Sequence, residues 1–152
     1  MSSERESLLH AVGEASRALQ ASVDALDEAV AGLLGINRTD LRCLDELLQA
    51  GELSPARLAE RVRLTTGSTT TLLDRLERAG YVTRSPDLRD RRRIVVRPTP
   101  KALDRAQDLY GPLAAEGVQA LSHLTPDELR TVLRYLQISR DLQQRHLERL
   151  RP

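Results

Sequence analysis

The fold is decided by residues 65–100, which read TTGSTTTLLDRLERAGYVTRSPDLRDRRRIVVRPTP. This stretch opens with threonine, glycine and serine, continues with leucines at helical spacing, and reaches Gly80, a residue type that commonly ends a helix. Two short segments of strand-forming composition follow at residues 81–85 and 92–97, with proline, aspartate and arginine between them. The pattern predicts a helix followed at once by a two-stranded β-hairpin.

A further helix is predicted immediately before this stretch. Ser54 precedes Pro55, and a capping serine before a proline at the first helical position favours a helix start. Leu58, Ala59 and Val62 have the spacing of an inward face. Two helices joined by a few residues form a helix-turn-helix candidate.

The first segment of the chain is predicted to be one long amphipathic helix. Apolar residues recur in steps of four and three from Ser3 to about Leu34. We expect Ser3 and Glu6 to form a capping box at its start and Gly35 to end it. A helix of about 30 residues is roughly 45 Å long. Because one small domain cannot cover that length, the apolar stripe is better explained by packing against a second subunit.

Three more helices complete the predicted order, at about residues 39–50, 99–122 and 125–150. The last opens with TPDE at residues 125–128, which combines an N-cap, a proline at the first helical position and a capping-box glutamate. The predicted fold class is therefore mainly α with one small β-hairpin.

Composition excludes several classes of protein. The 152 residues, 40% apolar and 30% charged, suit one compact domain or two small subdomains. The longest apolar stretch, residues 29–36, is too short to cross a bilayer, and the first ten residues lack the apolar run of an export signal, so we expect a cytoplasmic protein without membrane contact. A single cysteine supports neither a disulfide framework nor a multi-thiolate zinc site.

The net charge of +1 hides a separation of charge along the chain. Residues 54–101 contain twelve Arg or Lys against five Asp or Glu, a net charge of +7, whereas the rest of the chain carries −6. A basic segment within an otherwise acidic chain is typical of a polyanion-binding module. Duplex nucleic acid is the first candidate, because a chain without Phe or Trp offers little for stacking single-stranded bases.

In the order of its elements, and most specifically in residues 65–100, the chain resembles the MarR family of bacterial transcription regulators. The stretch is similar to the family's recognition helix, its D-R-L-E-x-x-G-Y-V exit and its D-x-R-D-R-R wing. The resemblance implies a winged helix-turn-helix and an obligate-type helical homodimer. It assigns residues 1–37 to an N-terminal dimerisation helix, residues 38–100 to the DNA-binding lobe and residues 101–152 to the C-terminal dimerisation helices.

The resemblance also implies a function. Members of the family usually bind pseudo-palindromic operators in double-stranded DNA as repressors. Many release DNA when a small anionic or phenolic effector occupies a cleft between the lobes, or when a cysteine is oxidised. We therefore expect a DNA-binding transcriptional regulator, with no cofactor and with an effector that the sequence does not identify.

Candidate DNA contacts on the recognition helix are Thr66, Gly67, Ser68, Thr70, Thr71 and Arg75. Short side chains in the first turns let the helix backbone approach the major groove closely. The alternative is that the threonines cap the helix, which is the better account of Thr65. Arg75 could reach a phosphate or could hold the hairpin. The family often has arginine where this chain has Thr71, so the bidentate guanine contact of that arginine is missing.

Candidate contacts on the wing are Arg89, Asp90, Arg91 and Arg92. The resemblance implies that the wing tip enters the minor groove, where a narrow A·T tract attracts a guanidinium. Arg91 is the strongest candidate, and Asp90 is expected to orient it through a charge-assisted hydrogen bond. The alternative is a solvated run of charge.

Catalytic and metal-dependent interpretations have few residues to support them. Cys43 lies among leucines, which is typical of an inert core residue rather than a redox sensor. His10, His123 and His146 are far apart in the sequence, so we expect no metal site. No nucleophile elbow, phosphate-binding loop or HExxH motif occurs, so we expect no enzyme. The main alternative function is a helical adaptor whose basic winged helix binds an acidic protein partner.

Overall fold

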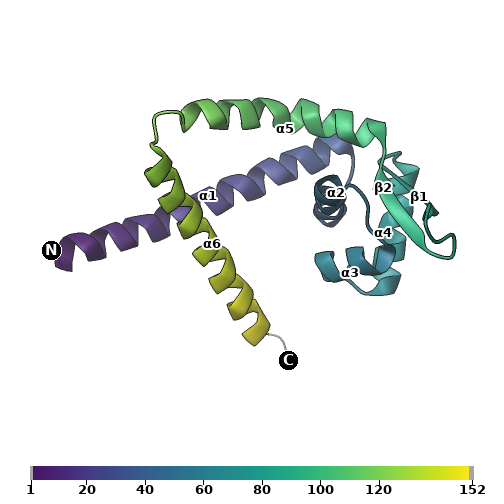
Figure 1. Cartoon of the computed structure of the whole chain (residues 1–152), viewed down its shortest axis with the longest axis horizontal. Coiled ribbons are helices and arrows are strands. Elements are labelled where there is room, and N and C mark those ends of the chain that lie inside the picture. The colour runs from purple at the N-terminus through teal and green to yellow at the C-terminus, as the bar shows by residue number, and fades with distance from the viewer. Residues whose placement is uncertain (1, 151–152) are drawn as a thin grey trace. The chain divides into compact units, whose positions relative to one another are not determined.

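The computed structural model describes residues 2–150, and within that range the chain forms six helices and one two-stranded sheet (Figure 1). The elements are α1 (Ser2–Leu34), α2 (Arg38–Ala50), α3 (Pro55–Val62), α4 (Thr66–Arg78), β1 (Val82–Pro86), β2 (Ile94–Pro98), α5 (Pro100–Ala120) and α6 (Pro126–Arg149). This order confirms the prediction of a mainly helical fold with one β-hairpin. None of the helices in residues 2–150 has the length and apolar character that crossing a membrane requires.

Capping residues set the starts of four helices. Asn37, Ser54, Thr65 and Thr125 each have extended backbone and accept a hydrogen bond from the backbone N–H three residues later. These bonds satisfy amides that have no partner inside the helix. Thr125 also forms the predicted capping box with Glu128.

The capping box predicted at Ser3 and Glu6 is wrong. α1 begins at Ser2, so Ser3 is a helical residue, whereas an N-cap has non-helical backbone. The Ser-x-x-Glu pattern does not identify a helix start by itself, because serine and glutamate are both tolerated inside a helix. The end of the same helix is as predicted, with Gly35 at φ +68°.

The hairpin follows α4 directly. β1 and β2 pair antiparallel, with Thr83 opposite Arg97. Both strands lie one or two residues further along the chain than predicted. Tyr81 is buried before β1 and its hydroxyl donates to Leu34 O at 2.9 Å, while residues 91–93 belong to the loop.

The buried core lies among α2, α3, α4 and the hairpin, which Figure 1 shows grouped together. The largest fully buried apolar side chains are Leu47, Leu58, Leu72, Leu73, Leu76, Val82 and Val96. Leucine and valine make this core because the chain has no Phe or Trp. The inward faces predicted for α3 and α4 are confirmed, and the last turn of α1 joins them through Val30, Ala31 and Leu34.

The described residues form two compact units that divide within α5, between Leu109 and Tyr110. The first unit holds α1 to α4, the hairpin and the first half of α5. The second holds the rest of α5 and α6, and no residue of α6 is buried. The division of the chain at residues 37 and 100 stays a prediction.

Candidate nucleic-acid interface

The first two turns of α4 combine a buried side and an exposed side. Thr69 is buried, and its hydroxyl donates to Thr65 O at 2.9 Å. The predicted contact residues on these turns are all exposed: Thr66, Gly67, Ser68, Thr70 and Thr71. A Cβ added at Gly67 would have nothing within 4 Å. The helix therefore presents a surface of small side chains that a large partner could approach closely.

Two exposed threonines of α4, Thr70 and Thr71, use their hydroxyl hydrogens for bonds within the helix. The Thr70 hydroxyl donates to Thr66 O at 3.0 Å, and the Thr71 hydroxyl donates to Gly67 O at 3.2 Å. A hydroxyl has one hydrogen and two acceptor lone pairs. Because the hydrogens are used within the helix, both oxygens are left as acceptors for a donor outside it.

Arg75 is joined to a buried carboxylate on α2. Its Nε lies 3.1 Å from Asp40 Oδ2 and its Nη2 lies 2.6 Å from Asp40 Oδ1, a bidentate pair. The Asp40 side chain is 3% exposed, whereas that of Arg75 is 41% exposed. The hydrogen bond with Asp40 raises the pKa of Arg75 above its ordinary value. Of the two roles open to Arg75, the geometry favours a structural one, and its partner is α2 rather than the hairpin.

A second ion-pair cluster joins the hairpin to α4. Arg84 of β1 places Nη2 2.6 Å from Asp74 Oδ1 and 2.5 Å from Glu77 Oε2. Hydrogen bonding to Arg84 lowers the pKa of Glu77. Hydrogen bonds to Glu77 and Asp74, in that order of size, raise the pKa of Arg84. The acidic residues of α4 therefore hold the hairpin and do not face outward as bare negative charge.

The wing loop, residues 87–93, is closed by its own aspartates. Asp87 N donates to Arg93 O at 2.8 Å, and Arg93 N donates to Asp90 O at 2.9 Å. Asp87 Oδ1 accepts from Arg89 N at 2.7 Å, and Asp90 Oδ1 accepts from Arg92 N at 3.1 Å. These side-chain bonds to the backbone two residues on are the usual way in which aspartate stabilises a turn.

The expected hydrogen bond from Arg91 to Asp90 is not among the contacts of the described loop, where the Asp90 carboxylate accepts from the Arg92 amide. A bond to the backbone N–H two residues on costs no side-chain ordering, whereas a bond from Arg91 would have to order a long side chain. Arg89, Arg91 and Arg92 are exposed around the loop.

The wing loop and the start of α4 share one hollow. Its volume is about 740 Å³, and it is lined by Thr66 of α4, by Asp87 and Arg93 of the wing loop, and by Ser54 and Arg57 at the start of α3, among others. Of the candidate DNA contacts, Thr66 lines this hollow, beside apolar residues such as Leu53, Ile94 and Val95.

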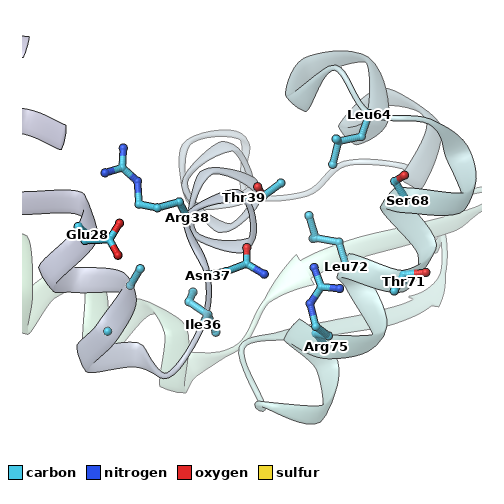
Figure 2. Close-up of a pocket in the computed structure, with 12 residues that line it drawn as sticks. Glu28, Ile36, Asn37, Arg38, Thr39, Leu64, Ser68, Thr71, Leu72 and Arg75 are labelled. Atoms are coloured by element: carbon cyan, nitrogen blue, oxygen red, sulfur yellow. The ribbon is translucent and has the colours of Figure 1, made fainter. Parts of the chain in front are cut away.

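A second hollow of about 670 Å³ lies between the junction of α1 with α2 and one side of α4 (Figure 2). Its lining residues are Glu28, Ala31, Gly32, Ile36, Asn37, Arg38, Thr39, Leu64, Ser68, Thr71, Leu72 and Arg75. Leucine and isoleucine walls with a few hydroxyl, amide and guanidinium groups suit a small ligand that carries a polar or anionic group.

Comparison with known proteins identifies the family. Residues 36–94 match the model of the MarR family. The HTH-type transcriptional regulator YcgE of Bacillus subtilis is 37% identical over 124 residues, which cover 82% of this chain and 80% of that protein. The chain belongs to the MarR family.

Solved structures show the MarR fold along the chain. Tm0710, a transcriptional regulator from Thermotoga maritima, is similar at a TM-score of 0.62 with 23% identity, over 90% of this chain and 96% of that one. A mutant of MarR from E. coli, complexed with operator DNA, is similar at a TM-score of 0.56 with 22% identity, over 84% of this chain and 92% of that one. In this winged-helix fold, α3 and α4 form the helix-turn-helix and the hairpin is the wing; α4 has the position that is called the recognition helix.

Cys43 lies in the core of this MarR fold, as predicted. It is a free cysteine with no exposed surface. Burial, with the nearby negative charges of Asp40 and Glu46, raises the pKa of the thiol to about 12. A thiol with that pKa is not ionised at neutral pH, so it is a poor nucleophile. The described part of the chain contains no group of three or more His, Cys, Asp or Glu that could hold a metal ion.

Sequence reasoning missed three residues of the interface region: Asp40, Arg84 and Leu88. Asp40 had a signal, because it stands four residues before Leu44 and seven before Leu47 on the inward stripe of α2. Arg84 had none, since its partners depend on how the hairpin folds back on α4. Leu88 is the one large apolar residue of the wing loop, and it is 91% exposed.

Proposed function

We propose that this MarR-family regulator binds a pseudo-palindromic operator in double-stranded DNA as a homodimer, acts as a repressor and is released by a small effector. The supporting observation is that the start of the recognition helix and the wing loop both present exposed groups suited to DNA. The helix has short side chains and a glycine with open space, the loop has exposed arginines, and both lie within a segment whose net charge is +7. We also propose that the protein acts in the cytoplasm and has no enzymatic activity.

The recognition helix would read base edges in the major groove. Thr66, Gly67, Ser68, Thr70 and Thr71 are its contact residues, and Gly67 lets the backbone approach. Because Thr70 and Thr71 offer acceptors, they suit the amino groups of adenine and cytosine, which are the donors in that groove. We assign Arg75 a positioning role, since Asp40 holds its guanidinium.

The wing would follow the DNA backbone into the minor groove. Arg89, Arg91 and Arg92 provide the positive charge, and a narrow groove with enhanced negative potential favours their guanidinium groups. Asp90 belongs to this site as the residue that closes the wing loop, without contacting DNA itself.

The homodimer would be formed by α1, α5 and α6, and the effector would bind in the hollow of Figure 2. Leucines along α1 and α6 are exposed in the single chain, among them Leu8, Leu19, Leu133 and Leu136. The hollow is lined by Ser68 and Thr71 of the recognition helix and by Arg38 of α2. A ligand there would contact the helix that reads DNA, which links its binding to the release of DNA.

The experiment that tests the function is selection of bound duplexes from a fragment library, with wild type and Arg91→Ala in parallel at two salt concentrations. We expect a pseudo-palindrome with half-sites about one helical turn apart, which the variant binds more weakly. If about six phosphates are neutralised, log K should fall with log salt at a slope of about −5. Binding that is blind to sequence, with Arg91→Ala indifferent, would instead support an adaptor for an acidic protein.

A further inference from the structure

Leu88 of the wing loop is unlike the other exposed apolar residues of the chain. It is 91% exposed, more than any other large apolar side chain in the described residues. Nearly all the others lie on α1, α5 or α6, where the proposed dimer would cover them. Leu88 lies outside these helices, in the loop between β1 and β2.

The loop holds Leu88 in a fixed turn. Its neighbour Asp87 both donates its amide to Arg93 O at 2.8 Å and accepts the Arg89 amide at 2.7 Å on its carboxylate. A leucine whose backbone is already held in a hydrogen-bonded turn loses little further backbone freedom when it enters a partner. A side chain with no packing role in its own fold is therefore presented outward.

The charges around Leu88 indicate the chemistry of its partner. Arg89, Arg91, Arg92 and Arg93 follow it within five residues, and all four are exposed. An apolar side chain among exposed guanidinium groups fits a surface that is anionic at its edges and apolar within. The DNA minor groove can offer that character, because phosphates line its rims and the apolar faces of the base pairs become accessible when a base step opens.

We propose that Leu88 is an apolar wedge that enters the minor groove and partly unstacks one base step, while the neighbouring arginines contact the phosphates on either side. Inserted leucines of this kind open a base step and kink the duplex. This inference rests on the proposed DNA-binding function. It adds a source of sequence preference, because pyrimidine–purine steps such as TA and CA are the most easily unstacked.

The test uses full-length wild type, Leu88→Asn and Leu88→Met on a duplex that wild type selects. Asparagine is close to leucine in size but polar, and methionine keeps the apolar character. A 2-aminopurine placed in turn at each step beneath the wing reports unstacking as a rise in fluorescence. We expect the rise with wild type and Leu88→Met, but not with Leu88→Asn. The asparagine variant should bind about tenfold more weakly per wing.

The salt dependence separates the wedge from the electrostatic contacts. Leu88→Asn should keep the wild-type slope of log K against log salt, whereas Arg91→Gln should reduce it by about 1 per wing. Equal affinity and fluorescence for wild type and Leu88→Asn would overturn the wedge. The wedge would also be overturned if Leu88→Asn lost affinity and, at the same time, showed a smaller slope of log K against log salt. That result would mean that the substitution disturbs the arginines. If wild type itself prefers no duplex, it is the proposed function that fails.

Discussion

At the scale of single residues, Asp40 stands out as a charged residue that is buried next to the exposed face of α4. Its carboxylate is buried beneath the recognition helix, and Arg75 is the cation that compensates it through two hydrogen bonds. A buried charge that loses its partner costs much more than the pair contributes when intact. The pair therefore fixes the position of α4 against α2, because a displaced helix would leave the carboxylate unpaired.

Arg75→Ala should lower the free energy of unfolding by about 3 kcal/mol, because it leaves Asp40 buried without a cation. Urea unfolding at a fixed protein concentration measures this loss. Arg78→Ala is the matched control, since Arg78 is an exposed arginine of the same helix, and it should change stability by less than about 0.5 kcal/mol. In an Asp40→Ala background the loss from Arg75→Ala should largely disappear. Equal losses for Arg75→Ala and Arg78→Ala would contradict this account of the pair.

Asp45 should make stability depend on pH between about 4 and 6. Burial, with the negative charges of Asp27 and Glu46, raises its pKa to about 6, against about 3.9 in an unfolded chain. It lines a hollow of about 220 Å³ between α1 and α2, together with Asp27, Arg38 and Arg42 among others. Because the folded pKa is the higher one, the ionised form destabilises the fold above pH 6, and protonation relieves this as the pH falls toward 4.

Asp45→Asn should therefore be more stable than wild type at pH 8 and equal to it near pH 4. Thermal unfolding of both proteins across that range measures the difference. The variant should also lose part of the rise in stability that wild type shows on acidification from pH 6. A variant less stable than wild type at pH 8 would show that the Asp45 carboxylate is stabilised, rather than strained, by its surroundings.

At the scale of elements, the recognition helix carries a glycine that the fold does not need. Gly67 is in the first turn of α4 with helical backbone and with no atom near the position of a Cβ. Alanine should therefore stabilise the helix by about 0.5–1 kcal/mol. In complex with DNA the same methyl group would keep the backbone away from the major groove.

Gly67→Ala should raise the melting temperature and weaken operator binding at least tenfold. Differential scanning calorimetry and fluorescence anisotropy, on the same samples, measure the two effects. The opposite signs matter, because a substitution that merely damaged the fold would lower both stability and affinity. Unchanged affinity would remove Gly67 from the proposed interface.

Three helix starts could be predicted from the sequence, unlike the start of α1 and the strand ends, whereas the contacts between elements could not be predicted at all. The caps at Ser54, Thr65 and Thr125 act over three residues, so the local pattern contains both partners. The ion pair of Arg75 joins residues 35 positions apart, and its geometry depends on the packing of α2 against α4. The same holds within the candidate site. Helical spacing predicts that the hydroxyls of α4 are exposed, but it does not predict that Thr70 and Thr71 donate their hydroxyl hydrogens to backbone carbonyls of the same helix.

At the scale of the whole molecule, a single chain leaves much apolar surface uncovered. α1 has 33 residues, and only its last turns contribute to the core. In α6, Leu129, Leu133 and Leu136 are exposed at helical spacing. Apolar stripes of this length mark protein interfaces. Winged helices that bind a pseudo-palindrome must also be paired, so the same surface that buries these leucines would set the distance between two recognition helices.

Wild type should sediment at twice the chain mass of 17.0 kDa, and the double variant Leu133→Glu with Leu136→Glu should sediment at the chain mass. Carboxylates placed on both copies of a buried apolar face lose hydration and repel each other, so the dimer should dissociate. Gln137→Glu is the control, because it adds one carboxylate to the same helix at a position that is already polar in wild type.

The monomeric variant should also bind the selected duplex at least a hundredfold more weakly than wild type, since two half-sites would then be bound independently. A wild type that sediments as a monomer would contradict the dimer, whereas a Leu133→Glu, Leu136→Glu variant that stays dimeric would place the interface on other residues of α1 and α5.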